Sequence, residues 1–349
     1  MAGTGDNFAT LSTQGVQPVP FSARADSRPC FLITVDTECD KAWSPTTQVC
    51  TANSCFLPRF QALCESYRLK ATYLTTFEMS ACPTFQEFGR DLLKRGPGEI
   101  GMHLHAWNSP PIVPLTSNDG LYHPYLIEYP EPVMRDKISF LTDFLEDTFA
   151  VKMTCHRAGR WGFNSIYARL LAERGYLADC SVTPLTSWAD HPGDPAQAGG
   201  PDYSRFPQSP YFIDLEDIQR PGKSSLLEIP VTVVELQPKP LRTLREWFRP
   251  RSLPRRALNR LFPPLCLLAP TRTNLGLIRR VVESSLATKL RCVNLALHSS
   301  NLMPGGSPQF RTAEDVEALY DALHRIFSAA SQKFRGATVT EFRREFVEA

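Results

Sequence analysis

Two short stretches of the sequence carry residue pairs that could bind a metal ion or move a proton. In "TVDTEC", Asp36 and Glu38 are two residues apart, and in "EIGMHLHAWN" the pair is His103 and His105. Side chains two apart on a β-strand point to the same face. Two carboxylates and two imidazoles that meet would suit a divalent ion. We expect zinc first, with manganese, cobalt or iron as alternatives.

Two further stretches carry residues suited to the same chemistry. "CHRAGRWGFN" contains Arg157 and Arg160, and "LALHSSNLMPGG" contains His298. An arginine at a strand end can clamp a carboxylate and fix its orientation, and for Arg160 a structural salt bridge is an equal alternative. A histidine in a loop beyond a strand can act as a general acid near neutral pH.

Strand-like and helix-like segments alternate along the chain, which positions these residues. Strand-like segments cover residues 30–38, 71–77, 99–105, 152–159, 176–184, 225–236 and 291–300. Amphipathic helical segments cover residues 57–70, 85–96, 134–150, 164–175 and 313–331, and Gly96 is an expected helix stop. This alternation predicts parallel strands with crossover helices, in an open doubly wound sheet or a closed barrel.

The chemically active residue types fall at or just past the carboxyl ends of the predicted strands. In both candidate architectures functional sites lie at that edge of the sheet. We therefore expect one site that contains Asp36, Glu38, His103, His105, Arg157, Asp179 and His298.

The motifs "TVDTE", "EIGMHLHAW", "RAGRWG", "ADCSVTP" and "LALHSS" occur in an order that resembles the polysaccharide deacetylases, the NodB-homology carbohydrate esterases. The resemblance covers roughly residues 29–346, and the most similar subgroup is the WalW-type deacetylases of lipopolysaccharide biosynthesis. It implies an α/β fold, a distorted (β/α) barrel of about seven parallel strands. It also implies metal-assisted hydrolysis of an N-acetyl or O-acetyl group on a polysaccharide or glycolipid sugar, with N-acetyl favoured.

The resemblance also implies roles for single residues. Asp36 matches the catalytic base and His103 matches the first histidine of the second motif. Arg157 matches the arginine that holds the base. His298 matches the general acid, and Asp179 matches the acidic residue that orients it.

Two positions depart from the common pattern of this family. Thr37 stands where a metal-binding aspartate is usual, and Trp107 stands where a second histidine is usual. Glu38 and His105 lie on the same strand faces as their partners in each motif, so they could replace the missing ligands.

We therefore expect Glu38, His103 and His105 as metal ligands, with Asp36 as the base. Exchanged roles for Asp36 and Glu38, or metal binding by both, stay open. A non-catalytic glycan-binding module on the same fold, and a hydrolase of another C–N bond or of a glycosidic bond, are the alternative functions. Trp107 and Trp161 could stack on sugar rings, with Arg160 beside them, and core packing is the alternative for both tryptophans.

The rest of the chain predicts one domain with additions. Residues 1–28 are expected to be a disordered tail, and residues 29–349 a single barrel domain. Insertions are expected at about 186–212, as a lid or binding loop, and at 237–274. The second insertion includes the basic segment 239–270, which could lie on an anionic membrane surface or attract an anionic glycolipid.

Composition limits the partners and the compartment. The chain has 349 residues and a formal net charge of +2, which argues against nucleic acid as the partner. Its ten cysteines show no CxxC pair, which favours reduced thiols. The first residues do not resemble a secretory signal, and no apolar run is long enough to span a membrane. These observations favour a cytoplasmic protein, and the basic segment 239–270 allows a position peripheral to the inner face of the membrane.

Overall fold

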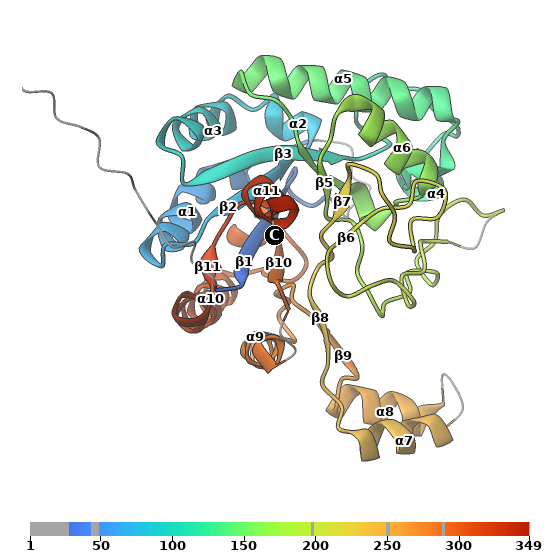
Figure 1. Cartoon of the computed structure of the whole chain (residues 1–349), viewed down its shortest axis with the longest axis vertical. Coiled ribbons are helices and arrows are strands. Elements are labelled where there is room, and N and C mark those ends of the chain that lie inside the picture. The colour runs from blue at the N-terminus through green and yellow to red at the C-terminus, as the bar shows by residue number, and fades with distance from the viewer. Residues whose placement is uncertain (1–27, 43–48, 197–198, 249–251, 288–289, 349) are drawn as a thin grey trace, which may run out of the picture.

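A curled sheet of nine strands forms the centre of the molecule (Figure 1). The computed structural model describes residues 28–42, 49–196, 199–248, 252–287 and 290–348. The strand order is β10-β1-β2-β3-β4-β5-β7-β6, and β11 pairs with the start of β1. The strands are β1 (Cys30–Thr37), β2 (Ala71–Thr75), β3 (Gly98–Leu104), β4 (Cys155–Ala158), β5 (Ala178–Asp179), β6 (Tyr211–Phe212), β7 (Leu227–Glu228), β10 (Cys292–His298) and β11 (Arg335–Gly336).

The path from β10 to β7 runs through seven strands, and all of its pairings are parallel. β6 is antiparallel to β7. The chain beyond β7 approaches β10, where the backbone amide of Thr232 donates to the carbonyl of Asn294 at 3.1 Å. The prediction of a distorted barrel of about seven parallel strands is confirmed, as a curled half-barrel.

Most helices pack on the outer face of this sheet (Figure 1). They and outward-facing strand residues, such as Phe31, Ile33 and Val35, form the larger of two apolar cores. α3 ends at Gly96, whose φ of +80° is a left-handed conformation, as the sequence predicted. The helices are α1 (Leu57–Ser66), α2 (Phe77–Ser80), α3 (Pro83–Arg95), α4 (Asp119–Tyr122), α5 (Glu131–Phe149), α6 (Ser165–Arg174), α7 (Lys239–Trp247), α8 (Leu253–Leu261), α9 (Ile278–Ala287), α10 (Ala313–Lys333) and α11 (Val339–Glu348), with 3-10 helices η1 (Ala52–Phe56), η2 (Leu126–Glu128), η3 (Gly159–Trp161) and η4 (Ser299–Leu302).

A smaller core lies on the opposite, inner face of the sheet. Four of its buried members are cysteines, and Phe342 from α11 belongs to the same cluster. Small apolar side chains suit the confined inside of a curled sheet. Because side chains alternate along a strand, Asp36 shares this inner face with Cys30, and Arg157 shares it with Cys155.

All ten cysteines are free in the structure, as predicted. Burial raises the pKa of the thiols of Cys155 and Cys180 well above the usual value, so the inner-core thiols are poorly reactive.

We expect ten titratable thiols per chain when the unreduced protein is denatured in the presence of a thiol reagent. In the native protein the exposed Cys50 and Cys55 should react first. A count below ten that is restored by reduction would contradict the free thiols, and with them the predicted cytoplasmic location.

The first predicted insertion, residues 186–212, ends in β6 of the main sheet, whereas the second includes a two-stranded sheet of its own. In residues 186–212 the described part is mostly irregular and includes a bridge between Ser187 and Asp202. Residues 237–274 include α7 and α8, which are attached by the antiparallel strands β8 (Val233–Glu235) and β9 (Leu265–Leu267). The predicted tail lies outside the described residues except for residue 28. Among the described residues, no helix combines the length and apolar character needed to cross a bilayer.

Candidate active site

The carboxyl ends of β1, β3, β4 and β10 bring the predicted residues together. In the sheet register Asp36 lies beside His298 and His103 lies beside Arg157. A cavity of about 500 Å³ opens at this edge. Its lining includes Asp36, Glu38, His103, His105 and His298.

Glu38, His103 and His105 form a buried cluster whose geometry suits a metal ion. The two Nε2 atoms of the histidines lie 3.1 Å apart. The Oε2 atom of Glu38 lies 3.8 Å from Nε2 of His103 and 3.3 Å from Nε2 of His105. Ligand atoms at the corners of a tetrahedron around zinc lie about 3.3–3.4 Å apart, because each bond is about 2.0–2.1 Å long. The three donor atoms therefore fit a divalent ion.

His103 is held in the form that can bind a metal. Its Nδ1 atom donates to the backbone carbonyl of Arg157 at 2.9 Å, which leaves the lone pair of Nε2 free for the cluster. Burial lowers the pKa of His103 to about 4, so its ring is neutral at physiological pH.

His105 is placed by neighbours in the segments that follow β3 and β4. The indole of Trp107 stacks on its ring, with centroids 4.5 Å apart. A Cβ atom on Gly159 would come within 2.6 Å of Cδ2 of His105, so this close approach of β3 and β4 requires glycine. Thr37, at the position of the usual aspartate, is buried and its hydroxyl donates to the carbonyl of Val35 at 3.0 Å.

Asp36 and Arg157 form a buried ion pair across the inside of the curl. Nη2 of Arg157 also donates to the hydroxyl of Thr34 at 2.5 Å, and Nε donates to the carbonyl of Cys180 at 2.9 Å. Burial alone would raise the pKa of Asp36, but Arg157, together with His103, holds it below its usual value. Asp36 is therefore an ionised carboxylate with a fixed orientation.

His298 is held by Glu38. Nδ1 of His298 lies 2.8 Å from Oε1 of Glu38 and 3.9 Å from Oδ2 of Asp36. Burial alone would lower the pKa of His298, but the Glu38 and Asp36 carboxylates raise it above its usual value. For the Glu38 carboxyl, burial alone would raise the pKa. The nearby His298 and His105 outweigh this effect and hold the pKa of Glu38 below its usual value.

The structure contradicts the expectation that Asp179 orients His298. Oδ2 of Asp179 lies 2.6 Å from Nδ1 of His156 and accepts a hydrogen bond from the hydroxyl of Ser181 at 2.9 Å. The physical reason is strand register, since Asp179 is the direct partner of His156 in the β4–β5 pair. His156 also contacts Tyr167 of α6 at 2.8 Å, so this pair faces the outer helices. Glu38 occupies the position expected for Asp179.

The turn after β4 places Arg160 and Trp161 at the cavity. Both residues have positive φ angles, +51° and +63°, which are uncommon for residues other than glycine and cluster at functional sites. The guanidinium of Arg157 lies over the ring of Trp161 at 5.1 Å, and that of Arg160 lies over Trp107 at the same distance. Trp107 therefore contacts both His105 and Arg160 as well as the cavity.

Several cavity residues were not singled out from the sequence. Trp188 and His191, from the first insertion, line the cavity, and Trp188 stacks on Trp161 with centroids 6.3 Å apart. Residues 269–271, from the end of the second insertion, line it as well. The sequence signal was the aromatic "SWADH" inside a predicted binding loop, although loop contacts depend on the tertiary fold.

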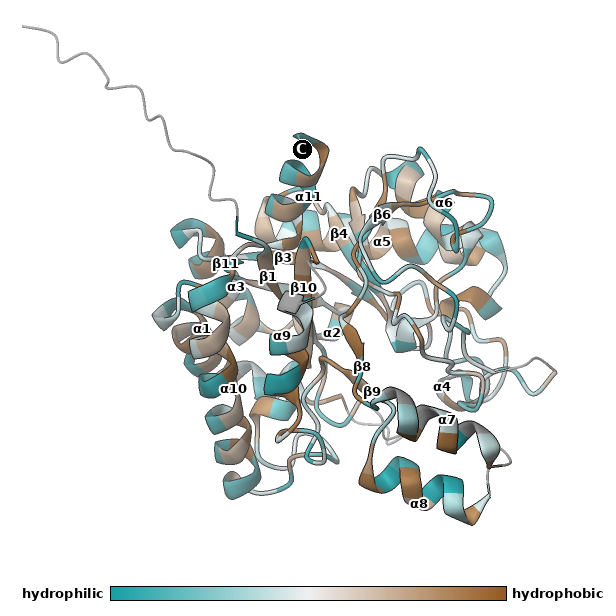
Figure 2. Ribbon diagram, turned by 60° about the horizontal axis from the view of Figure 1, so that its bottom comes forward, coloured by the Kyte–Doolittle hydropathy of each residue, from teal (hydrophilic) through white to brown (hydrophobic). Residues whose placement is uncertain are grey.

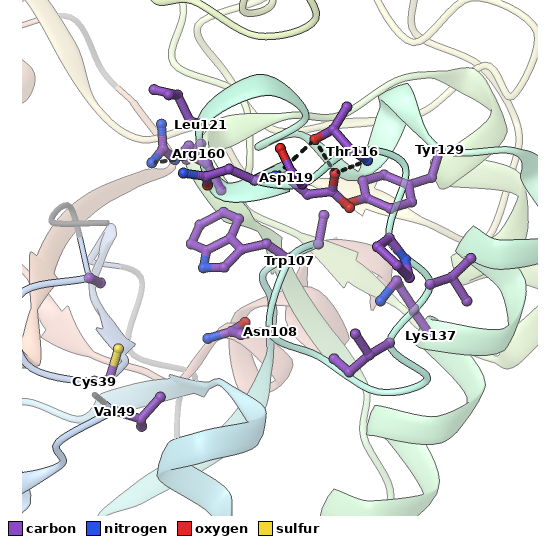
Figure 3. Close-up of a pocket in the computed structure, with 18 of the residues that line it drawn as sticks. Cys39, Val49, Trp107, Asn108, Thr116, Asp119, Leu121, Tyr129, Lys137 and Arg160 are labelled. Atoms are coloured by element: carbon purple, nitrogen blue, oxygen red, sulfur yellow. Dashed lines mark hydrogen bonds between the residues drawn. The ribbon is translucent and has the colours of Figure 1, made fainter. Parts of the chain in front are cut away.

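A second cavity of about 500 Å³ adjoins the first (Figure 3). Trp107 and Arg160 line both cavities and separate them. In Figure 3 Tyr129 and Lys137 lie on the side of this second cavity away from Arg160, and Asp119 lies between Arg160 and Tyr129. The Lys137 amine donates to the carbonyls of Ser109 and Pro111 at 2.6 and 2.7 Å, and burial lowers its pKa to about 8.

The metal cluster gives a direct prediction. The protein should bind one divalent ion per chain. His105→Ala should lower the metal content well below one ion per chain, because two protein ligands seldom retain zinc. Elemental analysis of the dialysed protein measures the metal content per chain. His324→Ala, at an exposed histidine on α10, is the matched control and should retain the ion. Equal metal content in both variants would contradict the proposed ligands.

Comparisons with known proteins agree with this fold. No family model matches the sequence, and no curated protein matches it. The chain is similar in structure to a candidate polysaccharide deacetylase from Mycobacterium smegmatis, with 16% identity, a TM-score of 0.52 and 96% of each chain covered. It is also similar to a candidate glycoside hydrolase/deacetylase from Parabacteroides distasonis, with 10% identity, a TM-score of 0.58, and 92% of this chain and 72% of that chain covered. The chain therefore has the curled, mostly parallel sheet of the NodB-homology polysaccharide deacetylase fold.

Proposed function

We propose that the protein is a metal-dependent carbohydrate deacetylase that hydrolyses an N-acetyl group on a sugar of a glycan or glycolipid. One observation carries the proposal. A single cavity joins a Glu-His-His cluster, a carboxylate held by a buried arginine, and a histidine held by a carboxylate.

Each group has a role in amide hydrolysis. A divalent ion, with zinc as the first choice, would polarise the acetyl carbonyl and make water more acidic. Glu38, His103 and His105 would hold it. Asp36 would accept the proton of the attacking water, and its ion pair with Arg157 keeps it ionised and oriented for this step.

His298 would donate a proton to the leaving amine. Its Nδ1 atom is engaged by Glu38, and Nε2 would be the ring atom that donates the proton to the substrate. The raised pKa favours the protonated ring that a general acid needs. Glu38 thus serves two groups, because Oε1 contacts His298 and Oε2 faces the two other histidines.

The aromatic cavity wall supports a sugar substrate. Trp161 and Trp188 lie in near-parallel planes, 16° apart, on one side of the cavity. Flat aromatic rings pack well on the apolar faces of sugars. The second cavity beyond Trp107 gives room for a neighbouring sugar unit. The resemblance to WalW-type deacetylases further suggests a lipopolysaccharide precursor as substrate and a cytoplasmic site of action.

A glycosidase is less well supported. Glycosidases need two carboxyl groups that flank the scissile bond. Here Asp36 is bound to Arg157, and Glu38 is bound among three histidines.

Acetate release tests the proposal. Chitin oligosaccharides and other N-acetylated oligosaccharides should release acetate, chelation should abolish the release, and added zinc should restore it. Release of reducing sugar without acetate would favour a glycosidase. Glycan binding without either product, in protein that contains the metal, would favour a binding module.

A further inference from the structure

The α7–α8 hairpin stands away from the body of the protein. It is attached through β8 and β9, and Figures 1 and 2 both show it beyond the end of these strands. Its base is closed by hydrogen bonds, including that from the amide of Leu236 to the carbonyl of Pro264 at 3.0 Å. The hairpin therefore projects from the body of the protein on a hydrogen-bonded two-stranded base.

That surface carries apolar side chains without cover from the described residues. Trp247, Leu253 and Leu261 are 83%, 79% and 73% exposed, the highest values among the large apolar side chains of the described residues. Leu244 and Phe262, at 41% and 48%, add to them. Scattered exposed apolar residues are ordinary, but a concentration of this kind marks an interaction surface.

The spacing of these residues places them on defined helix faces. Leu253 and Leu261 are eight residues apart, which is slightly more than two helical turns. They therefore lie along one side of α8. Leu244 and Trp247 are three residues apart on α7. Brown apolar and teal polar bands are visible on both helices in Figure 2.

The same hairpin is strongly basic. Residues 239–262 contain eight Lys or Arg residues and one acid, Glu246, in a chain whose net charge is +2. The segment thus carries net +7 while the rest of the chain carries net −5. Arg256 and Arg260 of α8 are exposed beside the apolar residues. This asymmetry selects an anionic partner.

We infer that the α7–α8 hairpin docks the protein on an anionic lipid membrane. Exposed Trp, Leu and Phe side chains next to arginines are the combination that amphipathic helices use at a bilayer interface. The apolar side chains would enter the headgroup boundary and the arginines would meet lipid phosphates. A nucleic acid would use the arginines but gain little from exposed leucines, and another protein surface would not require a charge of this size.

The hairpin is also linked along the chain to the candidate active site. β9 leads directly into residues 269–271, which line the catalytic cavity. One wall of the cavity is therefore connected to the docking hairpin through β9. If the proposed function holds, docking implies that the acetylated sugar is carried on a lipid. The docking inference itself does not depend on the proposed function.

Vesicle sedimentation with the full chain tests the inference. Vesicles of phosphatidylcholine with about one third phosphatidylglycerol should sediment the protein, and vesicles of phosphatidylcholine alone should not. Arg256→Gln with Arg260→Gln should weaken binding by roughly 25-fold, since each cation near an anionic surface contributes about fivefold. Trp247→Ser with Leu253→Ser and Leu261→Ser should weaken it by about tenfold or more, because these side chains supply the buried apolar area.

Matched controls separate docking from general charge or misfolding. Arg325→Gln with Lys333→Gln removes the same charge from exposed positions on α10 and should bind as the unaltered protein does. Acetate release from a soluble oligosaccharide should be unchanged in every variant, and vesicle binding is measured whether or not acetate is released. Equal loss in the α10 control, or equal binding to neutral vesicles, would overturn the inference. So would a hairpin variant that alters self-association or polyanion binding while vesicle binding stays intact.

Discussion

Asp36→Asn is expected to lower kcat for acetate release by about 10²–10⁴, the usual contribution of general acid–base catalysis. The amide of asparagine cannot accept the water proton, yet its oxygen can still accept a hydrogen bond from Arg157. Metal content should be unchanged, because Asp36 is not among the three clustered ligands. Steady-state kinetics on an N-acetylated oligosaccharide, with elemental analysis of the same sample, measures both quantities.

The substitution also leaves the buried Arg157 without a charged partner, which destabilises the fold. A broken buried ion pair typically costs about 3–5 kcal/mol. Thr34→Val is the matched control. It removes the hydroxyl that accepts a hydrogen bond from Nη2 of Arg157 but leaves the Asp36 carboxylate in place. Thr34→Val should lower the free energy of unfolding and reduce kcat far less. If Asp36→Asn keeps full activity, Glu38 or another group is the base.

The sequence predicted the fold well because its signals are local. Apolar β-branched runs alternate with amphipathic helices, and this alone predicts parallel strands with crossovers. The rule that sites lie at the carboxyl ends of such strands brought Asp36, His103 and His298 to one cavity, and Arg157 is joined to it through its ion pair with Asp36. The period of two along a strand likewise predicted that His103 and His105 would face the same side.

The sequence did not predict which polar residues contact one another across strands. Asp179 and His156 are paired by the register of β4 with β5, and register depends on packing over the whole sheet. The motif resemblance assigned Asp179 to His298, whereas the structure gives that role to Glu38, at 2.8 Å. Glu38 lies one residue beyond the end of β1, where the chain leaves the regular strand path.

The residues that form the cavity walls could not be predicted from local sequence patterns either. Trp188 and Thr271 are more than eighty residues apart in sequence, yet both line the cavity. A predicted loop can be called functional from its length and composition, but its contact partners are set by tertiary packing. The aromatic pair of Trp161 and Trp188 is therefore a result of the structure.

His298 is the residue on which the enzymatic proposal depends most. An amine leaves poorly unless it is protonated as the C–N bond breaks, and the Asp36 carboxylate assists only the attack of water. His298→Ala should therefore lower kcat on an N-acetyl substrate by about 10²–10⁴. Metal content and glycan affinity should stay nearly the same, since Glu38, His103 and His105 are retained.

An activated aryl acetate separates proton donation from pocket shape. Its leaving group needs no proton, so His298→Ala should affect this ester much less than the amide. His191→Ala is the matched control, since this exposed histidine lines the same cavity and contacts Trp188 but lies outside the proposed acid–base pair. It should change both substrates alike and only modestly. Equal losses on amide and ester in His298→Ala would show that His298 shapes the pocket, and no loss on either would show that another group donates the proton.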